Sequence, residues 1–148
     1  MTGDFPALVG TIIHHCGALE FLTNNAIRAL GTDDILSTKL INSPFSKRID
    51  VLRHLLKART KLQPSEIDNL CKDLQEIAEE RNVIAHNPIV HGDPQLKGTP
   101  RILVVRHTPE SAHIKKEITR EDLVSLANRT KTLLETFVRL IPSSTQTK

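Results

Sequence analysis

Four stretches of the chain repeat apolar residues at the spacing of an α-helix, and prolines or glycines separate them. The first runs from about Pro6 to Leu30, and Ile12, Leu19 and Ala26 recur in it at spacings of seven. The later stretches cover about residues 46–59, 65–87 and 120–141. Each apolar stripe must be buried against another element. The pattern therefore predicts an antiparallel four-helix bundle.

The interval before the last helix breaks this pattern. Residues 88–100 contain three prolines and two glycines and predict a loop. Residues 101–107 are apolar and β-branched, the turn sequence TPESA follows, and residues 113–118 predict a returning strand. Thr119 and Asp122 resemble the capping box that opens a helix. The expected fold class is therefore all-α, with a small β-hairpin inserted before the last helix.

The length of 148 residues fits one domain. We expect a single helical domain over residues 1–142 and a flexible tail over 143–148. No uninterrupted apolar run reaches the ~18–20 residues of a membrane-spanning helix. The acidic Asp4 and the lack of a basic segment before the first helix argue against a secretory signal. Cys16 and Cys71 are too few for a disulfide scaffold, and together with the missing signal they favour the reducing cytoplasm. The lack of a long apolar run predicts no contact with a membrane.

The composition excludes several classes of function. The chain has no Trp and no Tyr, and its four Phe lie in apolar-periodic stretches. RNA-binding folds that stack bases on exposed rings are therefore disfavoured. The net charge of +3 permits contact with nucleic acid without requiring it. Glycine-rich phosphate loops and the common hydrolase and zinc-protease motifs are missing, so those enzyme classes have no support.

One short string carries candidate chemistry. The third predicted helix ends in RNVIAHNP, where Arg81, Asn82 and His86 lie close together in sequence. Five helical steps rotate a side chain by about 140°, so Arg81 and His86 converge only if Arg81 uses its length or the helix loosens near Pro88. Two interpretations stay open. Arg81 pairs with nearby glutamates or carbonyls while His86 caps the helix, or the two groups act on a phosphate, since imidazole moves protons near neutrality and guanidinium binds phosphate.

The string resembles the Arg-x4–6-His motif of the HEPN superfamily, with a polar residue after the arginine. Residues 43–56, SPFSKRIDVLRHLL, are similar to the second helix of that superfamily, whereas the hairpin is a departure from its common core. The resemblance implies a bundle of four to five helices and a cofactor-free, metal-independent endoribonuclease that acts as a homodimer. Arg81, Asn82 and His86 would form its site. RNA would be cleaved by 2′-OH attack, leaving a 2′,3′-cyclic phosphate and a 5′-hydroxyl.

The resemblance also leaves alternatives. HEPN toxins of toxin–antitoxin systems commonly have a nucleotidyltransferase antitoxin as partner, so such a partner is an expectation for this chain. Other members of the superfamily are non-catalytic modules that bind RNA, a nucleotide or a protein. In that case Arg81 and His86 would hold the helix end or the dimer.

Two basic regions are candidate RNA contacts, namely Lys47 and Arg48 on the second helix and Arg101, Arg106, Lys115 and Lys116 on the hairpin. Each region has a structural alternative. Charged residues on a hairpin protect its edge from aggregation, and the second helix can instead pair with the acidic face of the third.

Metal binding is not expected. His14, His15 and Cys16 are adjacent, and adjacent helical residues point about 100° apart, so they cannot share an ion without distortion. His86, His91 and Asp93 form a second weak cluster, which we assign to loop polar groups that satisfy the backbone.

Overall fold

A computed structural model describes residues 4–31, 39–40, 42–87, 89–90, 101–107 and 109–141 of the chain. Within the strands, side chains are described only for Ile102, Val104, Lys116, Glu117 and Ile118. The described residues form four long helices, α1 (Asp4–Leu30), α3 (Phe45–Arg59), α4 (Pro64–His86) and α5 (Arg120–Leu140). A small sheet contains β1 (Ile89–Val90), β2 (Arg101–His107) and β3 (Ala112–Ile118). These bounds agree with the predicted helices and hairpin to within one or two residues.

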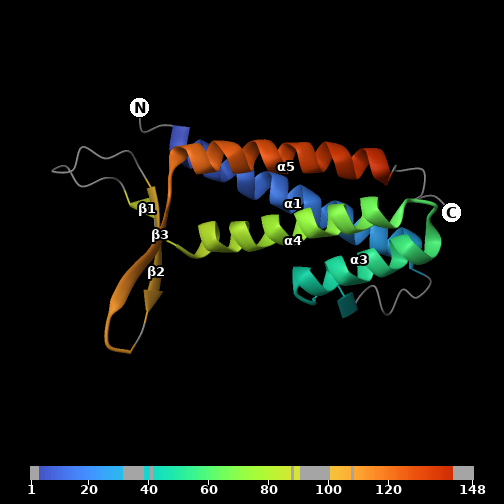
Figure 1. Ribbon diagram of the computed structural model, residues 1–148, viewed down its shortest axis with the longest axis horizontal. Helices are drawn as coiled ribbons and strands as arrows, with labels where there is room; N and C mark the ends of the chain where they lie inside the picture. Colours follow the sequence, from blue (N-terminus) through green and yellow to red (C-terminus); the bar gives the residue numbers. More distant parts are fainter. Residues whose placement is uncertain are drawn as a thin grey trace.

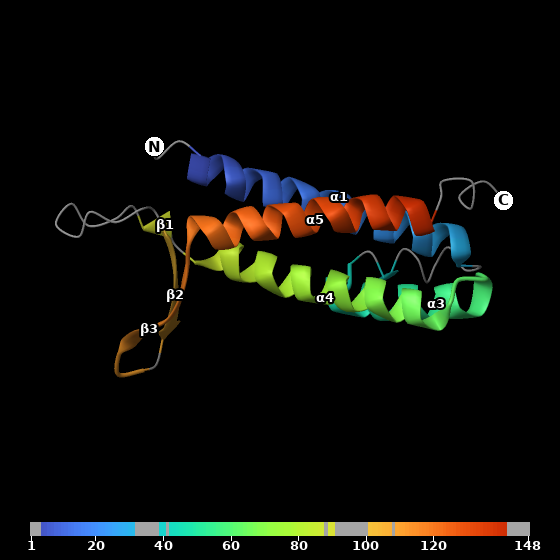
Figure 2. The same cartoon turned by 45° about the horizontal axis from the view of Figure 1, so that its top comes forward.

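The four helices pack together into an elongated bundle (Figure 1). The prediction of a helical bundle is thus confirmed, but the antiparallel arrangement holds only for the contacts of α4. Figures 1 and 2 show α1, α3 and α5 running in one direction and α4 in the other. The long connection from Leu30 to Phe45 is the reason, because it lets α3 start again along the direction of α1. The most extensive helix packing, between α1 and α5, is therefore parallel.

One apolar core joins all four helices. Its fully buried side chains include Ile12, Leu19, Leu52, Leu74 and Leu123. These residues belong to the apolar stripes on which the helices were predicted. Burying a Leu or Ile side chain contributes roughly 1.5–3 kcal/mol, so the shared core is the main source of stability. The tail over 143–148 lies outside the described residues.

The α1 helix is unusually apolar for a helix that is only partly covered. Residues Phe5–Leu30 have a mean hydropathy of 1.3 over an 18-residue window, which is long and apolar enough to cross a membrane by length and composition. The expectation that no segment is apolar enough to span a membrane was based on uninterrupted apolar runs. Polar residues do interrupt α1, but nearly all of them are uncharged, so they lower its mean hydropathy little. The helix packs against α3, α4 and α5, yet only 22% of that window is buried.

Local sequence sets the helix starts. At α5, the Thr119 backbone N–H donates to Asp122 Oδ2 at 2.9 Å and Thr119 Oγ1 accepts from the Asp122 N–H at 3.3 Å, so the predicted capping box is present. At α4, Pro64 occupies the first turn and the Gln63 N–H donates to Glu66 Oε2 at 3.3 Å. These contacts satisfy N–H groups that have no partner within the helix.

The sheet lies at the end of the bundle where α4 ends and α5 begins (Figure 1). Its order is β1-β2-β3, and both pairs are antiparallel. The predicted hairpin is confirmed as β2 and β3, with an irregularity between Val104 and Val105. The loop expected over 88–100 is wrong in part, because Ile89 pairs with Ile102 and Val90 with Arg101. Two residues are too short a strand to be read from a periodic pattern.

Candidate functional site

The last two turns of α4 carry the motif residues. The helix continues without a break to His86, and Asn87 leaves it in an extended conformation before Pro88. Asn87 Nδ2 donates to the Val83 carbonyl oxygen at 2.6 Å, which satisfies one of the free carbonyls at the helix end. Arg81 is half-buried, whereas Asn82 and His86 are exposed. The helix therefore does not loosen to bring Arg81 and His86 together.

Asn82 contacts Arg81 and lies one helical turn before His86. Its position, four before His86, places the two side chains on one face of α4. The Arg81 guanidinium bends toward that face, and its Nη1 donates to Asn82 Oδ1 at 3.2 Å. In the described residues no contact joins Arg81 or Asn82 to His86, so Arg81 and His86 are not brought together within one chain. His86 remains outside the pocket that Arg81 and Asn82 line.

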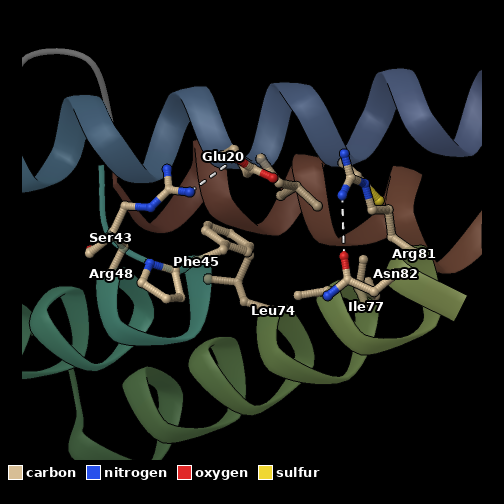
Figure 3. A pocket seen from close by; sticks show the side chains of 12 residues that line it. Glu20, Ser43, Phe45, Arg48, Leu74, Ile77, Arg81 and Asn82 are labelled. Atoms are coloured by element: carbon tan, nitrogen blue, oxygen red, sulfur yellow. Dashed lines mark hydrogen bonds and ion pairs between the residues drawn. The ribbon is translucent and has the colours of Figure 1, made fainter. Parts of the chain in front are cut away.

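That pocket has a volume of about 280 Å³ and lies between α1, α3 and α4. Figure 3 shows Arg48 of α3 and Arg81 of α4 at its two ends, with Glu20 of α1 between them. Its apolar lining includes Leu19, Leu74 and Ile77, and the remaining lining residues are Cys16, Ser43, Pro44, Phe45, Ala78 and Asn82. The pocket is mixed in character, with two guanidinium groups above an apolar floor.

Arg48 does not fit its predicted role as an RNA contact. Its side chain is only 10% exposed, and its Nη1 and Nη2 donate to Asn24 Oδ1 at 2.9 Å and to Glu20 Oε2 at 3.2 Å. The guanidinium carbon lies 5.1 Å from the centre of the Phe45 ring. Arg48 is buried because it lies four residues before Leu52 and next to Ile49, on the buried stripe of α3.

Sequence reasoning missed Glu20, Asn24 and Phe45 as members of this site. A signal was present, because Glu20 and Asn24 are four apart and therefore share a face of the otherwise apolar α1. A lone acidic residue and a lone amide on such a face indicate a basic partner. Which partner is chosen depends on packing between helices.

The other predicted RNA contacts are scattered. Lys47 is exposed on α3, and Lys116 is exposed on β3 near the end of α4. Arg101, Arg106 and Lys115 occupy strand positions whose side chains lie outside the described part of the chain. His91 and Asp93 also lie outside it. The described cations therefore do not form one continuous basic track.

Ion pairs hold α4 to its neighbours elsewhere. Lys57 Nζ of α3 lies 2.8 Å from Asp68 Oδ1 of α4, and Arg53 Nε lies 3.7 Å from the same oxygen. This confirms the alternative in which the basic second helix pairs with the acidic third. Arg129 of α5 contacts Glu80 at 2.7 Å and Glu76 at 3.3 Å, and the hydrogen bond that Arg129 donates to Glu80 raises the pKa of the guanidinium.

The cysteines are packing residues rather than nucleophiles. Burial raises the pKa of the Cys16 thiol to about 11 and also raises the pKa of Cys71. His15 Nδ1 lies 2.8 Å from Thr130 Oγ1, and its ring is tilted by 51° to that of His14. Across the described ranges, no three His, Cys, Asp or Glu side chains are grouped to hold a metal ion.

Comparison of the chain with protein-family models gave no match, and comparisons with curated proteins and with solved structures gave none either.

Proposed function

We propose that this protein is a metal-independent endoribonuclease of the HEPN type, in which Arg81, Asn82 and His86 act on one phosphodiester. A single observation carries the proposal. No carboxylate of the described residues lies within ion-pair distance of Arg81. The one described hydrogen bond of Arg81 is to Asn82, which shares a face of α4 with the exposed His86. Because folding gives the Arg81 guanidinium no counter-charge among the described residues, it is available to bind a substrate phosphate.

The chemistry needs few groups. His86 takes the proton of a ribose 2′-OH, and the 2′-oxygen attacks the adjacent phosphorus. The bond from phosphorus to the 5′-oxygen breaks, that oxygen takes up a proton, and a 2′,3′-cyclic phosphate remains. Arg81 donates to the phosphate oxygens that gain charge in the transition state, because its planar fork suits them. Asn82 orients Arg81 through the 3.2 Å hydrogen bond.

A second copy of the chain completes the proposed site. Within one chain His86 lies outside the pocket that Arg81 lines, so groups from a partner would supply the missing half of the cleft. The apolar and poorly covered α1 suits such an interface. Phe21 of α1 is 64% exposed and Val138 of α5 is 53% exposed. We therefore place the proposed interface at Phe21, which is the more exposed of these two side chains. A nucleotidyltransferase antitoxin remains a proposed further partner, and the reducing cytoplasm is the proposed compartment.

The decisive assay incubates mixed RNA with the purified protein in EDTA. His86→Ala and Arg81→Gln are each expected to slow cleavage by about 10²-fold or more, the range that proton transfer and transition-state charge stabilisation supply. His54→Ala is the matched control, because His54 is exposed on α3 and belongs to no part of the site. Equal cleavage by the unaltered protein and His86→Ala would defeat the assignment.

Mixing the two inactive variants tests the shared cleft. If the site takes its groups from two chains, dimers containing one copy of each variant regain part of the activity, because one intact combination of Arg81 and His86 is present. A site built within one chain regains none. Sedimentation analysis of Phe21→Glu, which should dissociate the dimer, links the recovery to the α1 face.

The second candidate function is a non-catalytic module that binds RNA, a nucleotide or a protein. The observation that favours it is that His86 does not line the pocket with Arg81. In this case Arg81 serves the helix end, and Arg81→Ala lowers the melting temperature by several degrees, since ~1 kcal/mol shifts it by a few degrees at this size. A catalytic role instead predicts lost cleavage with unchanged melting.

A further inference from the structure

The pocket between α1, α3 and α4 contains two of the unpaired buried donors of this molecule. Three buried side-chain nitrogen or oxygen atoms in the described residues have no hydrogen-bond partner, and all three are arginine Nε atoms, those of Arg48, Arg53 and Arg81. Arg48 and Arg81 line the pocket. Arg53 lies outside it, and the carboxylate of Asp68 is 3.7 Å from its Nε. Buried donors without an acceptor are rare in native proteins. Both atoms are closed to solvent, so they show that the wall of this pocket is rich in donors and short of acceptors.

The charges around the pocket do not cancel. Glu20 pairs with Arg48 at 3.2 Å, and that carboxylate and the Asn24 amide take up both Nη atoms of Arg48. Arg81 has only the neutral Asn82 as its described hydrogen-bond partner. The two arginines and one glutamate therefore leave a single positive charge, which a monoanion would balance.

The walls limit the size and character of such an anion. The volume of about 280 Å³ is just below the ~300–1,000 Å³ of ordinary ligand pockets, so the ligand is small. The apolar lining combines the buried core residues Leu19, Leu74 and Ile77 with Phe45 and Ala78, which are partly exposed. A bare inorganic ion would leave this surface unused.

We propose that the pocket binds a small organic monoanion, a carboxylate or a phosphodiester group on an apolar body. The anionic oxygens accept from the guanidinium of Arg81, and the apolar body lies against the apolar lining of the pocket, which includes Phe45 and Ala78. The site does not require the chain to cleave RNA. It shares Arg81 with the proposed nuclease site, so a bound monoanion would compete with an RNA phosphate for that side chain.

Calorimetric titration of the full chain with four probes separates the contribution of the ligand's negative charge to binding from that of its apolar part. Hexanoate is the carboxylate probe, and dibutyl phosphate is the phosphodiester probe. Two controls separate their features: acetate has the negative charge without the long alkyl chain, and 1-hexanol has the alkyl chain without the charge. We expect hexanoate, dibutyl phosphate or both to bind with a dissociation constant below about 1 mM, and the two controls to bind at least tenfold more weakly. The anion that binds more tightly shows whether the ligand carries a carboxylate or a phosphodiester group. No binding by either anion, or acetate binding as tightly as they do, overturns the proposal.

Paired variants localise the binding. Ala78→Leu fills the pocket from α4 and should weaken binding about tenfold or more, whereas Ala58→Leu makes the same change at an exposed position of α3 and should leave it unchanged. Arg81→Gln should weaken binding about tenfold, and Arg28→Gln removes an equal charge from an exposed position of α1 without that effect. Equal binding by Ala78→Leu and the unaltered protein, or equal losses in Arg28→Gln and Arg81→Gln, would contradict the assignment.

The amide spectrum of the unaltered protein provides a measurement that does not depend on any variant folding. Addition of the tighter anion should shift the backbone signals of Cys16, Phe45 and Ala78, which line the pocket. Shifts confined to other parts of the chain would overturn the proposal. Because binding is measured without RNA, this result and the cleavage assay fail or succeed independently.

Discussion

Two arginines face the same pocket and differ in what folding has done with them. Arg48, on the α3 side, is 10% exposed in its side chain and holds Glu20 and Asn24 of α1. Arg81, on the α4 side, is half-buried, and Asn82 is its one hydrogen-bond partner among the described residues. The first guanidinium joins two helices, whereas the second contacts its own helix in the described part of the chain. The hydrogen-bond partners of an arginine thus distinguish a charge that stabilises the fold from one that remains available to a ligand.

The largest effect should come from Arg48. We expect Arg48→Gln to lower the free energy of unfolding by about 2–3 kcal/mol, below the range for a fully buried pair because Glu20 is 33% exposed. The loss arises because Glu20 and Asn24 lose a charged donor and Phe45 loses its stacked guanidinium. Urea unfolding measures it. A loss below about 0.5 kcal/mol would mean that Arg48 is no more structural than Arg81.

The start of α5 should show a smaller effect that depends on pH. The Thr119 backbone N–H lowers the pKa of Asp122, and the Thr119 hydroxyl adds to this. A carboxyl whose pKa is lowered on folding stabilises the protein above the pKa of the unfolded chain, about 3.9, and the contribution is lost as the pH falls through the lower folded value. Asp122→Asn should therefore cost up to about 1 kcal/mol at pH 7.

The same variant should lose this disadvantage in acid. Unfolding curves of Asp122→Asn and the unaltered protein are expected to converge in acid, once the pH has fallen below the lowered pKa of the folded Asp122 carboxyl. A stability difference that stays constant from pH 7 to pH 2 would assign the effect to shape rather than to charge.

The ion pairs between α4 and α5 should contribute less. Arg129→Gln removes contacts to Glu80 at 2.7 Å and Glu76 at 3.3 Å, but all three side chains are more than 40% exposed. Exposed pairs are screened by water and salt, so we expect a loss of about 0.5 kcal/mol that shrinks at high salt. Thermal melting at two salt concentrations measures both quantities.

The smallest stability effects should be at the motif itself. Arg81→Gln and His86→Gln are each expected to change the free energy of unfolding by less than about 0.5 kcal/mol, because neither side chain holds another helix. The matched measurement is the urea unfolding used for Arg48→Gln. A loss at Arg81 as large as that at Arg48 would remove the distinction on which the proposed function depends.

The helices and the hairpin could be predicted from sequence because their signals are local. Apolar spacing, Pro64 and the Thr119–Asp122 pair locate the helices, and a β-branched run locates β2. The fate of Arg48 could not be predicted in this way, since a basic residue beside Lys47 has the same local pattern whether it faces solvent or Glu20. The direction of α3 also depended on the connection before it rather than on its own residues. The pocket is formed by three helices and has no counterpart in any single segment.

The parallel packing of α1 against α5 has a consequence for how the chain acquires its fold during synthesis. About 90 residues separate Leu30 from Arg120, so at ~5–20 residues per second the ribosome needs on the order of 5–20 s to supply the partner of α1. Throughout that interval the most apolar helix of the protein lacks its most extensive contact.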